Sequence, residues 1–205
     1  MRVLRSLQDV LQNKSRYAWA AAGAVAATFL LMTVAVSAVA QEGAMSPYQD
    51  EKDGVSAGGK WMEFQSEDKM TGAKKVRFVL VATNYFKEDP DSKPRVAIVC
   101  SNGKYEYGDF HPGERLGHPD YPGFWGQPKM EVMVRIDGSH DHKGWNWVRG
   151  HFLAMDKGTV RGMIGAEVFN VEVRTRSGQQ IAEFSPAGLN VDEVRKSCDL
   201  TPHKP

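Results

Sequence analysis

An Asn-Gly dipeptide between two β-type runs is the feature that most constrains the fold of this chain. Residues 96–100 alternate between two apolar faces, Asn102-Gly103 follows, and two tyrosines then alternate with charged or small residues. Runs rich in β-branched and aromatic residues on either side of such a dipeptide are typical of a β-hairpin. We therefore predict a hairpin over residues 93–110, with Cys100 at the end of its first strand.

Further β-type segments follow along residues 61–184. Residues 76–86 are apolar on both faces in the middle, and a second hairpin is predicted around Ser177-Gly178. The strongest helix signal is C-terminal, where Asn190 can cap a helix and Glu193 can complete a capping box. About eight strands with no strand–helix alternation predict a mainly β fold, an antiparallel β-sandwich or partly closed barrel with a short C-terminal helix.

The first forty residues are predicted to direct export. Residues 1–16 are basic, and residues 17–40 carry no charged side chain and end in Ala38-Val39-Ala40. A positive flank, an apolar run and small residues at the cleavage position are typical of a signal peptide. The run is also long enough to span a bilayer, so a retained membrane anchor stays open. In both cases the rest of the chain lies outside the cytoplasm, either free in the periplasm or anchored to the inner membrane and facing the periplasm.

The remainder divides into a linker and one domain. Residues 41–58 are polar and contain Gly, Pro and Ser, which predicts a disordered linker, and residues 59–205 form a single exported β domain. The net charge is +1, of which the first forty residues carry +3 and the rest −2. Because the basic residues form no stripe, nucleic acid is not an expected partner. Membrane contact is expected only through the N-terminal segment, if it is uncleaved.

Cys100 and Cys198 are the two cysteines of the chain. The first ends a predicted core strand, and the second lies on the apolar face of the predicted helix. In an oxidising compartment such a pair favours a disulfide over two buried thiols. Neither cysteine has neighbours that would activate a thiolate for catalysis.

Residues 108–129 show no periodicity, and a stretch of that length inside a domain is usually functional or an insertion. It holds Tyr121, Phe124 and Trp125 among prolines and glycines. Rigid loop aromatics supply a large contact area at low entropic cost, as protein-binding and sugar-binding surfaces require. These three are the candidate partner-binding residues. The open alternative is a cluster that only pins the loop onto the sheet.

His140 and His142 lie in a polar stretch that is expected to be a loop, and they can supply metal ligands. A His-x-His pair in an exposed turn is usually solvated, so no metal and no other cofactor is expected, with this pair as the alternative. The sequence has no Gly-x-Ser-x-Gly elbow, P-loop or dinucleotide fingerprint. No catalytic residue is therefore assigned.

The order of short motifs along residues 61–200 resembles the VasI/TagO-like family of type VI secretion-associated exported proteins. The motifs are Trp61, Ser66, Asp68-Lys69-Met70-Thr71, a strand ending in Cys100, a strand then Trp145, a hairpin then Phe184, and Gly188-Leu189 with Cys198. The resemblance implies a periplasmic accessory role beside the secretion apparatus, with no catalytic residues to transfer. Residues 108–129 and the histidine-containing stretch look like local elaborations.

The sequence thus favours a non-enzymatic accessory protein of the cell envelope that binds a protein, in the secretion machinery or a cell-wall enzyme. The alternative is a peptidoglycan- or glycan-directed binder or hydrolase that uses the aromatic loop. A metal-dependent enzyme that uses the two histidines is the third hypothesis.

Overall fold

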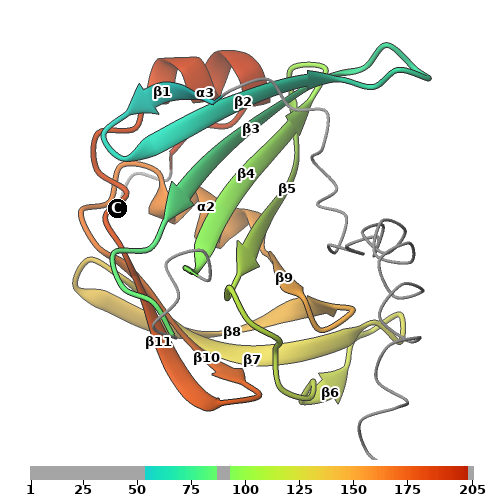
Figure 1. The fold of residues 1–205 in the computed structure, drawn as a ribbon, viewed down its shortest axis with the longest axis vertical. Helices are drawn as coiled ribbons and strands as arrows, with labels where there is room; N and C mark the ends of the chain where they lie inside the picture. The colour runs from blue at the N-terminus through green and yellow to red at the C-terminus, as the bar shows by residue number, and fades with distance from the viewer. Residues whose placement is uncertain (1–53, 87–92, 203–205) are drawn as a thin grey trace, which may run out of the picture. The chain divides into compact units, whose positions relative to one another are not determined.

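The computed structural model describes residues 54–86 and 93–202, which form an antiparallel sheet of eleven strands and two helices. The strands are β1 (Val55–Gly58), β2 (Trp61–Glu67), β3 (Lys74–Val81), β4 (Arg95–Ser101), β5 (Lys104–His111), β6 (Tyr121–Pro122), β7 (Pro128–Ile136), β8 (Ser139–Val148), β9 (Phe152–Met155), β10 (Phe169–Thr175) and β11 (Gly178–Phe184). The helices are α2 (Lys157–Met163) and α3 (Val191–Cys198). The prediction of a mainly β, antiparallel fold with a short C-terminal helix is confirmed (Figure 1). The expected number of strands and helices was too low.

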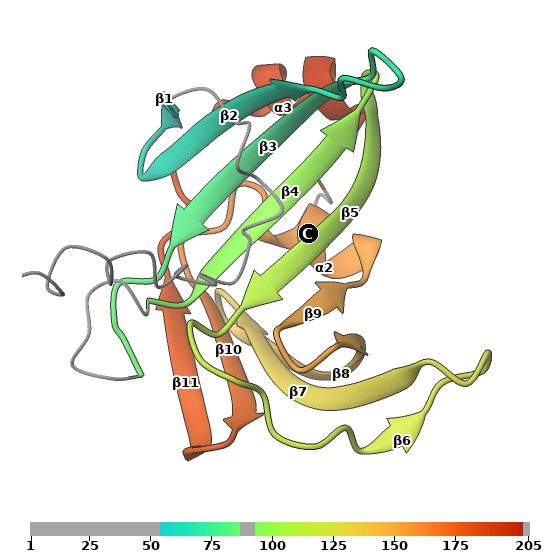
Figure 2. The same ribbon diagram turned by 45° about the vertical axis from the view of Figure 1, so that its right-hand side comes forward.

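The sheet has the strand order β1-β2-β3-β4-β5-β9-β8-β7-β10-β11, and β6 pairs with β7. β1–β5 make one part of it, and β7, β8, β10 and β11 make another that lies beyond β9 (Figures 1 and 2). Both predicted hairpins are present, as the pairs β4–β5 and β10–β11. Asn102 and Gly103 both have positive φ, 50° and 77°, which is the backbone conformation that favours this dipeptide in a two-residue turn.

The two parts of the sheet meet again just after β3. The backbone N–H of Thr83 donates to the carbonyl oxygen of Glu183 over 2.7 Å. The side chain of Asn84 donates to the carbonyl oxygen of Ile181 over 2.7 Å and accepts from the N–H of Glu183 over 2.9 Å. A carboxamide therefore occupies the edge of β11 where a further strand would pair. The sheet is only partly closed.

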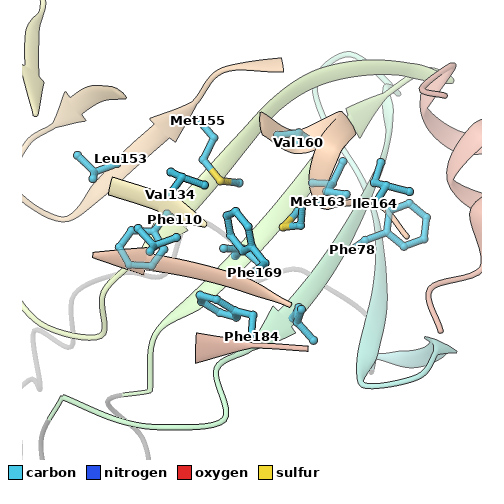
Figure 3. Close-up of a cluster of buried hydrophobic side chains, with 14 of the residues drawn as sticks. Phe78, Phe110, Val134, Leu153, Met155, Val160, Met163, Ile164, Phe169 and Phe184 are labelled. Carbon is cyan, nitrogen blue, oxygen red and sulfur yellow. The ribbon is translucent and has the colours of Figure 1, made fainter. Parts of the chain in front are cut away.

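The core lies between the two parts of the sheet and the helices. Figure 3 shows the central group of side chains, to which both parts of the sheet and α2 contribute. The ring of Phe184 lies 6.3 Å from that of Phe110 and 5.7 Å from that of Phe169, centroid to centroid. Val160 of α2 packs where Gly108 leaves room, because a Cβ at Gly108 would come within 2.5 Å of a Val160 methyl.

The predicted disulfide is present and joins β4 to the end of α3. Cys100 and Cys198 are bonded, with their Cα atoms 5.1 Å apart, and both are buried. Asn190 caps α3 as predicted and accepts from the N–H of Glu193 over 3.2 Å. The reciprocal bond of a capping box is absent among the described contacts, because the Asn190 N–H donates to the carbonyl oxygen of Ala57 instead. That bond ties α3 to β1.

The N-terminal boundary of the domain differs from the prediction. The last four residues of the expected linker form β1, which pairs with β2. The strand is held by backbone contacts, because Gly58 and Gly59 lie so close to the backbone of Ala187 and Gly188 that a Cβ would collide there. The predicted signal or anchor, residues 1–40, and linker residues 41–53 lie outside the described residues. Neither described helix has the length and apolar character that crossing a bilayer requires.

Asp156 begins α2 and is the acid whose titration we expect to affect stability. Its carboxylate accepts from the N–H of Thr159 over 2.8 Å, from the Thr159 hydroxyl over 2.6 Å and from Trp145 Nε1 over 3.1 Å. Burial raises the pKa of Asp156, but these hydrogen bonds together have the larger effect and lower it. The pKa of Asp156 therefore lies below its ordinary value. A carboxylate with a lowered pKa contributes stability above pH 4 or so and loses that contribution as the pH falls through its folded-state pKa.

We therefore expect Asp156→Ala to lower the free energy of unfolding by about 1 kcal/mol at pH 7, as loss of an N-cap does. Urea unfolding should show this difference from wild type shrinking below about pH 4, where the wild-type carboxylate becomes protonated. Asp156→Asn retains a capping oxygen and is the matched control, with a smaller loss that does not change with pH. A difference in unfolding free energy between Asp156→Ala and wild type that stays constant from neutral to acidic pH would contradict this role.

Candidate binding surface: the β6–β7 hairpin and the adjoining groove

The β6–β7 hairpin presents the predicted aromatic residues. Tyr121 of β6 pairs with Lys129 of β7. The turn between them is closed by the N–H of Gly123 donating to the carbonyl oxygen of Gln127, and by the N–H of Gly126 donating back to Gly123 over 2.9 Å. Gly126 has φ of +75°, a conformation that side chains with a Cβ rarely adopt. The glycines and prolines of this stretch thus form a defined turn and not an irregular loop.

Phe124 and Trp125 stand at the tip of this hairpin and are almost fully exposed, at 91% and 84%. Their rings contact each other edge to face with centroids 4.9 Å apart. Side chains exposed to this degree do not fix the loop to the sheet. Two other residues hold the loop on the sheet instead. Leu116 is buried, and Trp147 Nε1 donates to the carbonyl oxygen of Gly117 over 3.0 Å.

Tyr121 connects the hairpin to a shallow groove on the outer surface of the sheet. Its hydroxyl lies over Gly144 of β8, where a Cβ would collide with it. Gly144 is opposite Glu131 of β7, one of the residues that line the groove. The groove is open, with a volume of about 210 Å³, and is lined by Asp120, Glu131, Val132, Met133, His142, Glu172, Arg174 and Gln179.

The groove contains more carboxylates than cations, and its side chains are linked in pairs. Arg174 donates to Asp120 over 2.5 Å, and His142 Nδ1 lies 3.0 Å from a Glu131 oxygen. Burial raises the pKa of Asp120, but the hydrogen bonds from Arg174 and from the Glu131 N–H lower it by more, so its net pKa is lowered. These pairs give the groove fixed hydrogen-bonding groups next to exposed aromatic rings.

The predicted histidine loop is wrong, because His140 and His142 belong to strand β8. The turn is only Asp137-Gly138, with Asp137 at φ 50°, and pairing with β7 resumes at once. The polar character of this stretch arises because one end of β8 is solvated on both faces, where Asp141 and Lys143 pair over 2.6 Å.

The two histidines share one face of β8 but do not converge with further ligands. His140 lies opposite Arg135, and His142 lies opposite Met133 beside Glu131. Within residues 54–86 and 93–202, no group of three His, Cys, Asp or Glu side chains is arranged to hold a metal ion. The arrangement gives the metal-dependent hypothesis no support.

Sequence reasoning missed most of the groove. The alternation of Glu131, Met133 and Arg135 along β7 indicates a solvated outer face, and this signal was present in the sequence. The partners on β8, β10 and β11 follow only from strand pairing over long separations. No protein-family model matches this chain, and neither a curated protein nor a solved structure matches it.

Proposed function

We propose that this chain is a non-enzymatic accessory protein of the cell envelope that binds a protein partner through Tyr121, Phe124 and Trp125. The observation that carries the proposal is the exposure of two adjoining aromatic rings at the tip of a defined turn. Large apolar side chains displayed together on a rigid element are typical of binding hot spots. The partner would be a component of the secretion machinery, as the resemblance to the VasI/TagO-like family implies, or a cell-wall enzyme.

A periplasmic location is part of the same proposal. The N-terminal sequence has the pattern of an export signal or anchor, and the Cys100–Cys198 disulfide is typical of oxidising compartments. The charge pattern does not favour nucleic acid, and membrane contact would be made only through the N-terminal segment. The protein would act by binding its protein partner, and no cofactor is expected.

The groove beside the hairpin favours one alternative, a peptidoglycan- or glycan-directed binder. Sugar rings stack on exposed aromatic faces and take hydrogen bonds from fixed polar side chains, and both are present here. Carboxylates such as Glu131 and Glu172 would also be the residues to test for hydrolysis.

We expect Phe124→Ala/Trp125→Ala to weaken binding of the protein partner by about 30-fold or more, as loss of a hot spot does. Pull-down from envelope extract, followed by titration with the identified partner, measures the effect. Because both side chains are exposed, the melting temperature should stay close to that of wild type. Tyr85→Ala, at an exposed aromatic residue on another part of the domain, is the matched control and should bind normally.

Sedimentation with purified peptidoglycan separates the two functions. Loss of peptidoglycan binding in the double variant, with protein capture unchanged, would favour the glycan-directed alternative. If the double variant binds both the protein partner and peptidoglycan normally, the hairpin is rejected as the binding site.

A further inference from the structure

Two arginines lie opposite each other beside the groove. Leu116 forms an antiparallel bridge with Thr175, and both side chains are buried. The N–H of Arg176 donates to the carbonyl oxygen of Arg115 over 3.0 Å, which continues this pairing by one residue. Because side chains alternate between the two faces of an extended chain, Arg115 and Arg176 share the outer face. These two exposed residues are here called the arginine pair.

The outer face continues from the arginine pair into the groove. Arg174 lines the groove and precedes Arg176 by two residues on the same chain. The N–H of Gly117 donates to the carbonyl oxygen of Arg174 over 2.9 Å, and a Cβ at Gly117 would lie 3.2 Å from Arg174 Cγ. Both views show the β10–β11 turn and the chain that leads into β6 at the same end of the domain (Figures 1 and 2). The arginine pair therefore extends the groove at this end.

The charges of the arginine pair are not matched within the described part of the chain. There, neither guanidinium has an ion pair or a side-chain hydrogen bond. The neighbouring carboxylates have other contacts, since Glu114 accepts from the Ser177 hydroxyl over 2.8 Å and Asp120 is bound by Arg174. Like charges directly opposite each other on a sheet are destabilising. An anion from outside the chain would relieve this repulsion.

The backbone under the arginine pair is held in place by the β8–β9 turn. The N–H of Leu116 donates to the carbonyl oxygen of Gly150 over 3.0 Å, and a Cβ at Gly150 would lie 3.1 Å from the ring of Trp147. The turn therefore lies beside Arg115, and it carries Arg149, which is exposed and has φ of 51°. A backbone that is already ordered limits the entropic cost of binding to the side chains.

We propose that the arginine pair binds carboxylates of an acidic segment in the same protein partner that the aromatic hairpin recognises. The inference rests on the proposed function, because it adds a charge to the partner of that site. A guanidinium binds a carboxylate through two parallel hydrogen bonds. Arginine, tryptophan and tyrosine are also the residue types that are enriched in binding hot spots.

One partner can reach both the arginine pair and the hairpin. Tyr121 follows Arg115 by six residues, which span at most about 20 Å. A standard interface buries about 800 Å² on each partner and is then about 30 Å across. The two contacts therefore fit within a single interface of ordinary size.

An acidic protein segment fits this surface better than an anionic membrane does. The chain beyond its first forty residues carries a net charge of −2, and Asp120, Glu131 and Glu172 line the groove next to the arginine pair. A flat anionic surface would meet these carboxylates as well and be repelled by them. An extended segment can place its own carboxylates on the arginines alone.

Binding of a fluorescein-labelled hexaglutamate peptide by the full-length protein, measured by fluorescence anisotropy at low salt, tests the proposal. We expect Arg115→Gln/Arg176→Gln to weaken this binding at least about tenfold, because two charged hydrogen-bonding groups are lost. Its melting temperature should equal or exceed that of wild type, since the repulsion between the two arginines is removed. Arg95→Gln/Arg195→Gln removes the same charge at exposed sites on β4 and α3 and is the matched control, which should bind like wild type.

Equal binding of hexaglutamate by wild type and the arginine-pair variant would overturn the proposal. An equal loss in the control variant would also overturn it, because net charge alone would then explain binding. Binding of phosphatidylglycerol vesicles without binding of hexaglutamate would do the same, since the anion would then be a lipid phosphate.

The partner identified by the hairpin experiment separates this inference from the proposed function. It should bind the arginine-pair variant more weakly and with a smaller salt dependence than wild type. Phe124→Ala/Trp125→Ala should still bind hexaglutamate normally, because its arginines are intact. Loss of partner binding in the hairpin variant alone, with the arginine-pair variant unchanged, would overturn this inference and leave the proposed function supported.

Discussion

Replacing Cys100 and Cys198 together by alanine is expected to lower the free energy of unfolding by about 4 kcal/mol. The bond closes a loop with a sequence separation of 98, and the chain-entropy model assigns about 4–5 kcal/mol to a loop of that size. Alanine is preferred to serine because both sites are buried and a hydroxyl there would need hydrogen-bond partners. Urea unfolding at neutral pH measures the loss.

The wild-type protein under reducing conditions is the matched comparison for this variant. It should lose a similar amount of stability while keeping both sulfur atoms in the core. The last turn of α3 should become labile first, since its remaining apolar anchors are few, chiefly Val194 and the following Leu200. A loss below 1 kcal/mol in both experiments would show that packing alone holds α3 on the sheet.

Trp61→Ala is the second change with a large expected effect, a loss of about 3–5 kcal/mol, which is the usual range for a fully buried tryptophan. Trp61 is 0% exposed and lies opposite Leu80 on β3. Its Nε1 donates to the carbonyl oxygen of Pro186 over 2.8 Å, so the side chain also holds the segment that leads into α3. Truncation removes the packing and the hydrogen bond together.

Two variants separate these contributions. Trp61→Phe keeps an aromatic ring but leaves the Pro186 carbonyl without its donor, and it should cost about 1–3 kcal/mol. Trp125→Ala is the same truncation at an 84% exposed site and should change stability by less than about 0.5 kcal/mol. Similar unfolding free energies for Trp61→Ala and Trp125→Ala would contradict the assigned role.

The features predicted correctly from the sequence are those that short-range patterns control. The Asn102-Gly103 turn requires positive φ at both residues, so the dipeptide itself defines the β4–β5 hairpin. The Cys100–Cys198 bond was predicted because two cysteines on predicted apolar faces of a chain that is expected to be exported leave a single possible pairing. The cap at Asn190 was predicted for the same local reason.

The features that the sequence did not reveal depend on partners far along the chain. β1 has the sequence VSAG, which carries a weak strand signal, and it is held by contacts with residues 187–190. The first half of β8 was predicted to be a loop, because its polar residues hide the pairing with β7, whereas the extended pattern from Trp145 onward was predicted correctly. In the groove, Arg174 and Asp120 are 54 positions apart, so their ion pair follows from the sheet order and not from any motif.

Asn84 has a consequence for the behaviour of the protein at high concentration. β11 is the last strand of the order, and a terminal strand can recruit a strand from another molecule and so start polymerisation. The carboxamide of Asn84 occupies the hydrogen-bonding groups of Ile181 and Glu183 that such a recruited strand would use. One short polar side chain thereby occupies, at this border of the sheet, hydrogen-bonding groups that a strand from another molecule would need.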